Sequence, residues 1–360
     1  MMRAKLFGCF YKWIRHLVIS YFARQREKNN DHPDLEDAEI FGDEKLKIFN
    51  QYLSPFLFRF RVPKTIQVRL HNLTFPSPLT SAAFKDDLDI LSIWFKMGLG
   101  GVCLKTVMQN PREGNVRPRL QEVLFQGSPH LVNALGLPGP GVQGLVESLS
   151  NATVFDFDRP VGISLGGQTP QEYESVMMTM EAFFKEKGIY NYYYELNISC
   201  PNIEGGSQFL HDVEALYRLL QGLRKKTTAV LGIKISPELE NDQVLLLAEA
   251  MTYIDKSFIN AGNTAYYTCQ KLGLPYDALS QKGGGLSGLS LFSRTLELMF
   301  LLAPFKVPTI ATGGISDFQH VRAVLDSGAT LVGMATALVQ NPYQIPIINQ
   351  KLLQRHRTLR

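Results

Sequence analysis

The chain has 360 residues and a net charge of +4, and 45% of its residues are hydrophobic while 19% are charged. These values describe a folded globular protein, long enough for one large α/β domain with a small appendage or for two ordinary domains. The mild charge, with no Lys/Arg cluster continuing through the chain, argues against a nucleic-acid-binding protein. No CxxC pair occurs, so the sequence predicts reduced thiols with neither a metal site nor a disulfide framework. The cysteines are Cys9, Cys103, Cys200 and Cys269.

Residues 5–26 carry apolar side chains at three- and four-residue spacing, which predicts one apolar helical face. Lys12, Arg15 and His16 interrupt the apolar run before it reaches the roughly 20 residues that a membrane-spanning helix needs. Basic residues lie mostly elsewhere around the helix, so the segment is typical of a helix in a membrane interface. A signal peptide and a helix packed on its own protein are the alternatives; the first lacks a clean cleavage site. The apolar face comprises Leu6, Phe10, Trp13, Ile14, Leu17, Val18 and Tyr21.

Residues 27–39 are acidic and contain a proline, a composition that predicts a linker or an exposed loop. A second amphipathic helix is expected over 44–60, and the two helices together would form an apolar vestibule. The body of the protein begins near "RVPKT". We therefore divide the chain into a helical extension over 1–62 and a catalytic domain over 63–360.

From residue 75 onward, short β-rich runs alternate with amphipathic helical patterns. Most of these runs are apolar throughout, as expected of parallel strands that are covered on both faces. Eight β-then-α units predict a (β/α)8 barrel, and no GxGxxG motif supports a doubly wound sheet. The runs are 78–83, 101–107, 160–167, 192–199, 230–236, 257–263, 308–314 and 330–337.

In a (β/α)8 barrel the chemistry lies at the carboxyl ends of the strands. These ends are rich in amides, hydroxyls and glycines, and Lys105 and Lys234 are among them. Two lysines and two asparagines on such a rim are hard to explain structurally, although one lysine could lie on the surface and one asparagine could cap a turn. The Gly-Gly and Ala-Thr turns after the last two strands, with "GGGLSG" over 283–288, predict a phosphate site. Lys234 could then place a positive charge near a flavin ring.

The chain resembles the dihydroorotate dehydrogenases, which are FMN-dependent (β/α)8 barrels, from about residue 63 to 340. Nine ordered motifs carry the resemblance, and together they are far more specific than any one of them. They are "LTFPSPLTSAA", "LKTVMQNPREGNVRPR", "VNALGLPGPG", "ELNISCPN", "GIKISP", "NAGNT", "GGLSG", "ATGGI" and "GMATAL".

The resemblance implies oxidation of dihydroorotate to orotate in pyrimidine biosynthesis. Cys200 would take the proton from C5 while a hydride leaves C6 for N5 of FMN, and residues 203–209 would form a mobile flap. Asparagine amides present both donors and acceptors, which suits the edge of the pyrimidine. The implied substrate-binding residues are Lys105, Asn133, Asn197, Asn202, Asn263 and Thr264. The implied cofactor-binding residues are Ala82, Ala83, Lys105, Thr106, Asn197, Lys234, Thr264, Gly288, Gly313, Gly314, Ala335 and Thr336.

The chain combines features of the two broad kinds in this family. Cys200 resembles the base of the soluble enzymes, which use fumarate or, through a partner subunit, NAD, whereas the amphipathic extension resembles that of the membrane-associated enzymes, which reduce a quinone. "SAAF" also departs from the family, which often has a glycine after the alanine pair. We expect a quinone as the electron acceptor. The chain is expected on the cytoplasmic face of a membrane, bound through residues 5–26, or free in the cytoplasm. A homodimer is possible from the sequence.

Two other classes of enzyme remain open from the sequence. Another FMN barrel could reduce a pyrimidine-like ring, as dihydropyrimidine and dihydrouridine reductases do. A phosphate-binding aldolase or isomerase could act through Lys234 as a Schiff-base lysine, which would need no flavin. A flavin spectrum in the purified protein separates the second class from the others.

Overall fold

The core of the molecule is a barrel of eight parallel strands. A computed structural model describes residues 1–198, 209 and 212–358, in which the strand order is β3-β14-β13-β10-β9-β8-β7-β4. A parallel bridge between Thr80 and Gly101 joins the two end strands and closes the barrel. All eight strands lie inside the predicted runs, so the predicted (β/α)8 fold is confirmed. They are β3 (Leu79–Ser81), β4 (Val102–Val107), β7 (Val161–Leu165), β8 (Tyr192–Asn197), β9 (Val230–Ile235), β10 (Ser257–Ala261), β13 (Thr309–Thr312) and β14 (Leu331–Met334).

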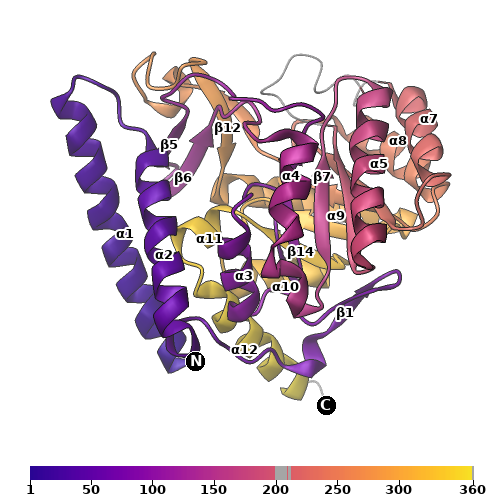
Figure 1. Ribbon diagram of the computed structural model, residues 1–360, viewed down its shortest axis with the longest axis horizontal. Helices are drawn as coiled ribbons and strands as arrows, with labels where there is room; N and C mark the ends of the chain where they lie inside the picture. Colours follow the sequence, from indigo (N-terminus) through magenta and orange to yellow (C-terminus); the bar gives the residue numbers. More distant parts are fainter. Residues whose placement is uncertain (199–208, 210–211, 359–360) are drawn as a thin grey trace.

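Helices cover the outside of the barrel (Figure 1), and some of them begin at a residue whose side chain caps the first turn. Helix α7, for example, is capped by Asp212, whose side chain accepts the backbone N–H of Ala215, and it buries four leucines at three- and four-residue spacing. This amphipathic pattern packs each helix against the apolar outer face of the strands. The helices of the barrel are α3 (Leu88–Met97), α4 (Gly141–Ser150), α5 (Pro170–Lys187), α7 (Val213–Arg224), α8 (Asn241–Thr252), α9 (Phe292–Leu302), α10 (Phe318–Asp326), α11 (Thr336–Gln340) and α12 (Gln344–Thr358).

Two smaller sheets complete the barrel. The hairpin of β1 (Val68–Leu70) and β2 (Leu73–Phe75) packs on residues that begin barrel strands, including Tyr193 and Phe258, and so closes the amino-terminal end. The antiparallel sheet β11-β12-β6-β5 lies at the opposite, carboxyl-terminal end. Its strands are β5 (Leu120–Phe125), β6 (Ser128–Asn133), β11 (Ala265–Thr268) and β12 (Gly283–Ser287). The glycine-rich segment 283–288, predicted as a phosphate loop, is therefore largely strand β12.

The first residues form a hairpin of two long helices, α1 (Met2–Lys28) and α2 (Leu35–Leu57), along one side of the barrel (Figure 1). The predicted linker over 27–39 is wrong, because only residues 29–34 connect the helices. The rings of Phe7 on α1 and Phe56 on α2 pack edge to face, with 5.2 Å between their centroids. Tyr343, which precedes α12, contacts Phe7 and Tyr11.

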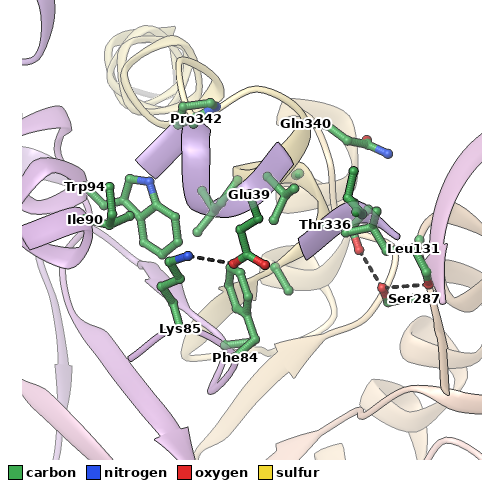
Figure 2. A pocket seen from close by; sticks show the side chains of 18 of the residues that line it. Glu39, Phe84, Lys85, Ile90, Trp94, Leu131, Ser287, Thr336, Gln340 and Pro342 are labelled. Atoms are coloured by element: carbon green, nitrogen blue, oxygen red, sulfur yellow. Dashed lines mark hydrogen bonds and ion pairs between the residues drawn. The ribbon is translucent and has the colours of Figure 1, made fainter. Parts of the chain in front are cut away.

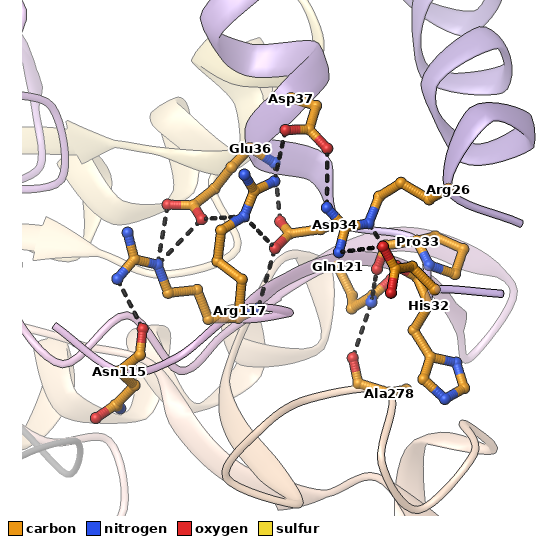
Figure 3. Close-up of polar contacts among 12 residues, drawn as sticks. Arg26, His32, Pro33, Asp34, Glu36, Asp37, Asn115, Arg117, Gln121 and Ala278 are labelled. Atoms are coloured by element: carbon orange, nitrogen blue, oxygen red, sulfur yellow. Dashed lines mark hydrogen bonds and ion pairs between the residues drawn. The ribbon is translucent and has the colours of Figure 1, made fainter. Parts of the chain in front are cut away.

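Ion pairs fix the amino-terminal end of α2 to the barrel (Figure 3). Asp34 caps α2 by accepting the backbone N–H of Glu36, and its buried carboxylate also lies 2.8 Å from Nε of Arg117. Arg117 contacts Asp37 at 2.8 Å as well, and Arg119 contacts Glu36 at 3.0 Å. Three acidic residues of the predicted loop, Asp34, Glu36 and Asp37, are thus the N-cap and first turn of a helix, and they pair with arginines that are distant in the sequence.

The hairpin exposes a set of large apolar side chains. Among the residues predicted to face a membrane, Trp13 is 58% exposed and Leu6 66% exposed. The small residues Ala4 and Gly8 of α1 are buried, so α1 packs on the protein through one side and presents large apolar side chains on another. None of the helices in the described ranges has the length and hydropathy needed to cross a bilayer. We call the exposed residues the apolar patch: Leu6, Phe10, Trp13, Ile14, Leu17 and Tyr21 of α1 with Phe49, Tyr52, Leu53 and Phe56 of α2.

Candidate active site

One cavity of about 670 Å³ joins the carboxyl-terminal mouth of the barrel to the helical hairpin. Every predicted site residue that the structure describes lines it, so residues from all parts of the chain meet in one place. They are Ala82, Ala83, Lys105, Thr106, Asn133, Asn197, Lys234, Asn263, Thr264, Gly288, Gly313, Gly314, Ala335 and Thr336. The predicted base Cys200, Asn202 and residues 203–208 of the predicted flap lie outside the described residues.

The register of the barrel places three polar residues in one layer. Asn197, Lys234 and Asn260 are direct partners on the neighbouring strands β8, β9 and β10. Residues in register on parallel strands point to the same side of the sheet, so these side chains share the inside of the barrel near its carboxyl end. Asn197 and Lys234 line the cavity, whereas Asn260 is buried and does not line it.

A buried carboxylate lies beneath this layer. Glu195 is fully enclosed, and its Oε2 accepts a hydrogen bond of 2.7 Å from Nδ2 of Asn260. Burial raises the pKa of Glu195, while the charge of Lys234 and the amide of Asn260 oppose that rise. Sequence reasoning missed Glu195 and Asn260, although a carboxylate and an amide inside otherwise apolar strands are the signal that could have found them.

Amides and hydroxyls line the side of the cavity next to β4 and β7. Asn197 Nδ2 donates to Thr106 Oγ1 at 2.9 Å, and this hydroxyl lies 2.9 Å from Ser164 Oγ. The hydroxyl of Tyr173 donates to the carbonyl oxygen of Asn197, which fixes the end of β8. Across the cavity, Asn133 Nδ2 donates to the carbonyl oxygen of Gly285 at 3.2 Å.

The last two barrel strands end in a small, glycine-lined corner. Gly313 and Gly314 both have positive φ, and a Cβ on Gly314 would lie 2.5 Å from the backbone nitrogen of Phe292. Thr295 Oγ1 donates to the carbonyl oxygen of Gly313 and holds this turn. Opposite it, Thr336 Oγ1 lies 2.9 Å from Ser287 Oγ, which donates to the carbonyl oxygen of Leu131 (Figure 2).

Charged side chains form a cluster where the cavity passes from the barrel to the hairpin. Lys85, which follows β3, is buried and contacts two carboxylates of α2, Glu39 at 2.6 Å and Asp43. Figure 2 shows Glu39 reaching down to Lys85 beside Trp94 and Phe84. Burial raises the pKa of Asp43 to about 6, because Lys85 compensates the desolvation only in part and Glu39 adds a like charge.

The residues present fit a flavin mononucleotide. Two buried oxygens on the cavity wall, Asn197 Oδ1 and Thr312 Oγ1, meet no hydrogen-bond partner among the described residues. Buried polar atoms are rarely left unpaired, so such atoms indicate a ligand. Gly313 and Gly314, the predicted phosphate corner, line the same cavity as the two cationic side chains Lys105 and Lys234. Fold and site together describe a (β/α)8-barrel enzyme with a cofactor-sized cavity at its carboxyl-terminal mouth.

Comparison with known proteins agrees with this description. A sequence profile of dihydroorotate dehydrogenase matches residues 65–355, and the chain belongs to that family of flavin-dependent oxidoreductases. It is 30% identical over 285 residues to the catalytic subunit of dihydroorotate dehydrogenase B (NAD(+)) from Pyrococcus furiosus, covering 78% of this chain and 90% of the relative. The corresponding subunit from Oceanobacillus iheyensis is 29% identical over 292 residues, covering 79% of this chain and 91% of the relative.

The fold is similar to that of the dihydroorotate dehydrogenase from Eimeria tenella, solved in complex with ferulenol. The TM-score is 0.73 at 18% identity, and the match covers 89% of this chain and 92% of that chain. Residues 65–360 make up less than 89% of the chain, so the match must include residues before 65 and the similarity of fold extends into the helical hairpin.

Proposed function

We propose that the protein oxidises dihydroorotate to orotate with FMN as its cofactor and passes the electrons to a quinone. The observation that carries the proposal is the single cavity, which runs from the predicted flavin and substrate residues to the inner side of α1 and α2. Bound FMN would accept the hydride from C6 of dihydroorotate and later release two electrons to the acceptor.

The roles of the protein side chains follow from their chemistry. Asn133, Asn197 and Asn263 offer amide donors and acceptors for the planar edge of the substrate, and Asn202 is proposed beside them. Cys200 would remove the proton from C5, since a thiol of ordinary pKa near 8.5 becomes a base when local donors stabilise its thiolate. Lys105 and Lys234 would hold negative charge on the substrate and cofactor, and the corner at Gly313 and Gly314 would hold the phosphate.

The hairpin supports a quinone as the acceptor. It lies outside the region that matches the family profile, and it supplies an apolar wall that a water-soluble acceptor would not need. Phe10, Ile14, Phe49 and Leu53 belong both to the cavity lining and to the apolar patch, so the cavity reaches the exposed apolar surface. The names of the relatives favour NAD as a second candidate, reached through a partner subunit.

We also propose that the apolar patch docks on a lipid surface. Exposed aromatic and aliphatic side chains on a helix pair, with basic residues such as Lys5 and Lys12 on the same helix, are typical of interfacial binding. Docking would place the opening of the cavity against the bilayer, where a quinone is dissolved. The proposed location is therefore the cytoplasmic face of a membrane.

The test separates the two half-reactions. The full-length flavoprotein is reduced anaerobically with dihydroorotate and then mixed, in separate experiments, with a short-chain ubiquinone, fumarate or NAD. Reoxidation of the flavin by the quinone alone is the expected result. Failure of dihydroorotate to bleach the flavin would refute the dehydrogenase, whereas reoxidation by fumarate or NAD alone would refute only the quinone.

A further inference from the structure

The proposed reaction needs a proton donor close to the quinone, and the charged cluster of Lys85, Glu39 and Asp43 lines the cavity in which the quinone would bind. Reduction of a quinone to a quinol adds two electrons and two protons to its two carbonyl oxygens. The hydride taken from dihydroorotate accounts for both electrons and one proton. One further proton must therefore reach a quinone oxygen inside an apolar cavity, where water is a poor source.

We infer that Asp43 is the acid that delivers this proton, with Glu39 and Lys85 as its positioning residues, and the inference rests on the proposed quinone reaction. In the step, the carboxyl O–H bond of Asp43 breaks and an O–H bond of the quinol forms. The carboxylate left behind regains a proton from solvent. Glu39, whose side chain is 37% exposed, connects the cluster with that solvent.

The geometry supports Asp43 over its neighbours. Its side chain lines the cavity and is only 18% exposed, and Lys85, which holds it, is 9% exposed. One ammonium cannot fully compensate two adjacent carboxylates in a buried setting, so one carboxyl retains a proton more readily than an isolated aspartate would. The raised pKa of Asp43, about 6, agrees with this and puts the donor near neutral pH.

The other ionisable groups around Asp43 are unsuited to the task. Burial raises the pKa of Tyr11 to about 12, and its hydroxyl donates to the carbonyl oxygen of Val339. Burial lowers the pKa of Lys85, but the two carboxylates raise it by more, so Lys85 stays charged. The groups facing the cluster are Tyr11 and Arg15 of α1, Glu39 and Lys47 of α2, and Lys85 and Asp87 after β3.

The first test follows reoxidation of the dihydroorotate-reduced protein by a short-chain ubiquinone from pH 5 to pH 8. The wild-type rate should fall about tenfold per pH unit once Asp43 ionises, above about pH 6. Asp43→Asn should react about 100-fold more slowly at pH 6 with no such pH dependence. Glu44→Gln, the exposed neighbour on α2, is the matched control and should behave as the wild type.

The second test measures quinone binding and the protonation of Asp43 without turnover. Trp13→Phe leaves Trp94, which lines the cavity, as the only tryptophan and hence as a fluorescence probe of quinone binding. In this background, Asp43→Asn should leave the Kd for the quinone within about threefold, because the proton moves only during reduction. Infrared difference spectra should show one carboxyl that titrates near pH 6 in the wild type and is missing in Asp43→Asn.

Several outcomes would overturn the inference. If Asp43→Asn keeps the wild-type rate and pH dependence, the cluster only fastens α2 to the barrel. If Asp43→Asn does not fold, Asp43→Glu is tested in its place. This variant keeps a carboxyl group, so loss of the pH dependence in Asp43→Glu would also contradict the inference. If the quinone fails to reoxidise the wild-type protein, the proposed quinone acceptor and this inference both fail. If the quinone reoxidises the wild-type protein and only the Asp43→Asn result differs from the expected one, the inference fails and the quinone reaction stands.

Discussion

Asp34 and Arg117 join two parts of the chain that are 83 residues apart, with the Asp34 carboxylate buried and 2.8 Å from Nε of the arginine. Asp34 is also the residue that starts helix α2. The same side chain therefore begins the helix and attaches it to the barrel. Because α2 forms one wall of the cavity, this ion pair also helps to set the shape of the proposed acceptor site.

Replacing Asp34 with alanine should loosen the hairpin without unfolding the barrel. Arg117 keeps Asp37 as a partner and is 34% exposed, so we expect a local loss of about 1–3 kcal/mol. Hydrogen exchange should become faster in residues 1–57 and stay unchanged in the barrel helices. Asp31→Ala is the control, since Asp31 is 59% exposed and 3.8 Å from Arg26; equal exchange in both variants would contradict the prediction.

Replacing Gly42 with leucine should fill the cavity at little structural cost. A Cβ on Gly42 would meet no atom within 4 Å, and this residue lines the cavity from α2. Removing a glycine from a helix interior should also raise helix stability by about 1 kcal/mol. We expect reduction by dihydroorotate to be unchanged. Reoxidation by a subsaturating quinone should slow about tenfold, which corresponds to a loss of about 1.4 kcal/mol in acceptor affinity.

The control for this variant is Gly222→Leu. Gly222 lies in α7, its added Cβ would likewise meet no atom within 4 Å, and it does not line the cavity. Both half-reactions should therefore be unaffected in the control. Normal quinone reduction by Gly42→Leu would show that the acceptor approaches by another route.

Replacing Cys200 with alanine should preserve flavin binding and slow flavin reduction by dihydroorotate about 100-fold or more, because a general base is lost. Cys200→Ser should retain part of the rate, with its optimum at higher pH. Stopped-flow absorbance of the flavin measures both. Cys9→Ser, at an exposed position on α1, is the control, and a normal rate in Cys200→Ala would assign the base elsewhere.

Replacing Trp13 or Tyr52 with serine should weaken binding to vesicles of phosphatidylcholine and phosphatidylglycerol. These side chains are 58% and 72% exposed in the apolar patch, and partial burial of each in lipid should contribute about 1 kcal/mol, or about fivefold in partitioning. Tyr190→Ser is the control, because Tyr190 is 83% exposed before β8, outside the patch. Equal sedimentation with vesicles in all variants would mean that the patch does not meet lipid.

The barrel could be predicted from the sequence because its strands are continuous apolar runs that end in polar or small residues. In-register strands then bring Asn197 and Lys234 together, although 36 residues of chain separate them. The position of the described site residues in one cavity follows from that regularity. Their roles in binding stay predictions.

The antiparallel sheet was missed in part because one of its two inner strands, β12, begins with three consecutive glycines. Close packing explains them: a Cβ on Gly285 would lie 2.1 Å from Thr264 Oγ1, and one on Gly284 would lie 2.4 Å from the Asn133 carbonyl oxygen. Local composition favours a loop there, and only tertiary contacts make it a strand. The cluster around Lys85 was missed because its two carboxylates, Glu39 and Asp43 of α2, lie 46 and 42 residues before Lys85 in the chain and meet it only in the folded protein.

The cavity has two walls of different origin, one from the barrel and one from α1 and α2. The family profile covers the barrel wall but begins only after α2. A small inhibitor wedged between Gly42 and Trp94 would touch both walls at once. Such a compound should bind this enzyme more tightly than it binds members of the family that consist of the barrel alone, because those members lack the wall formed by α1 and α2.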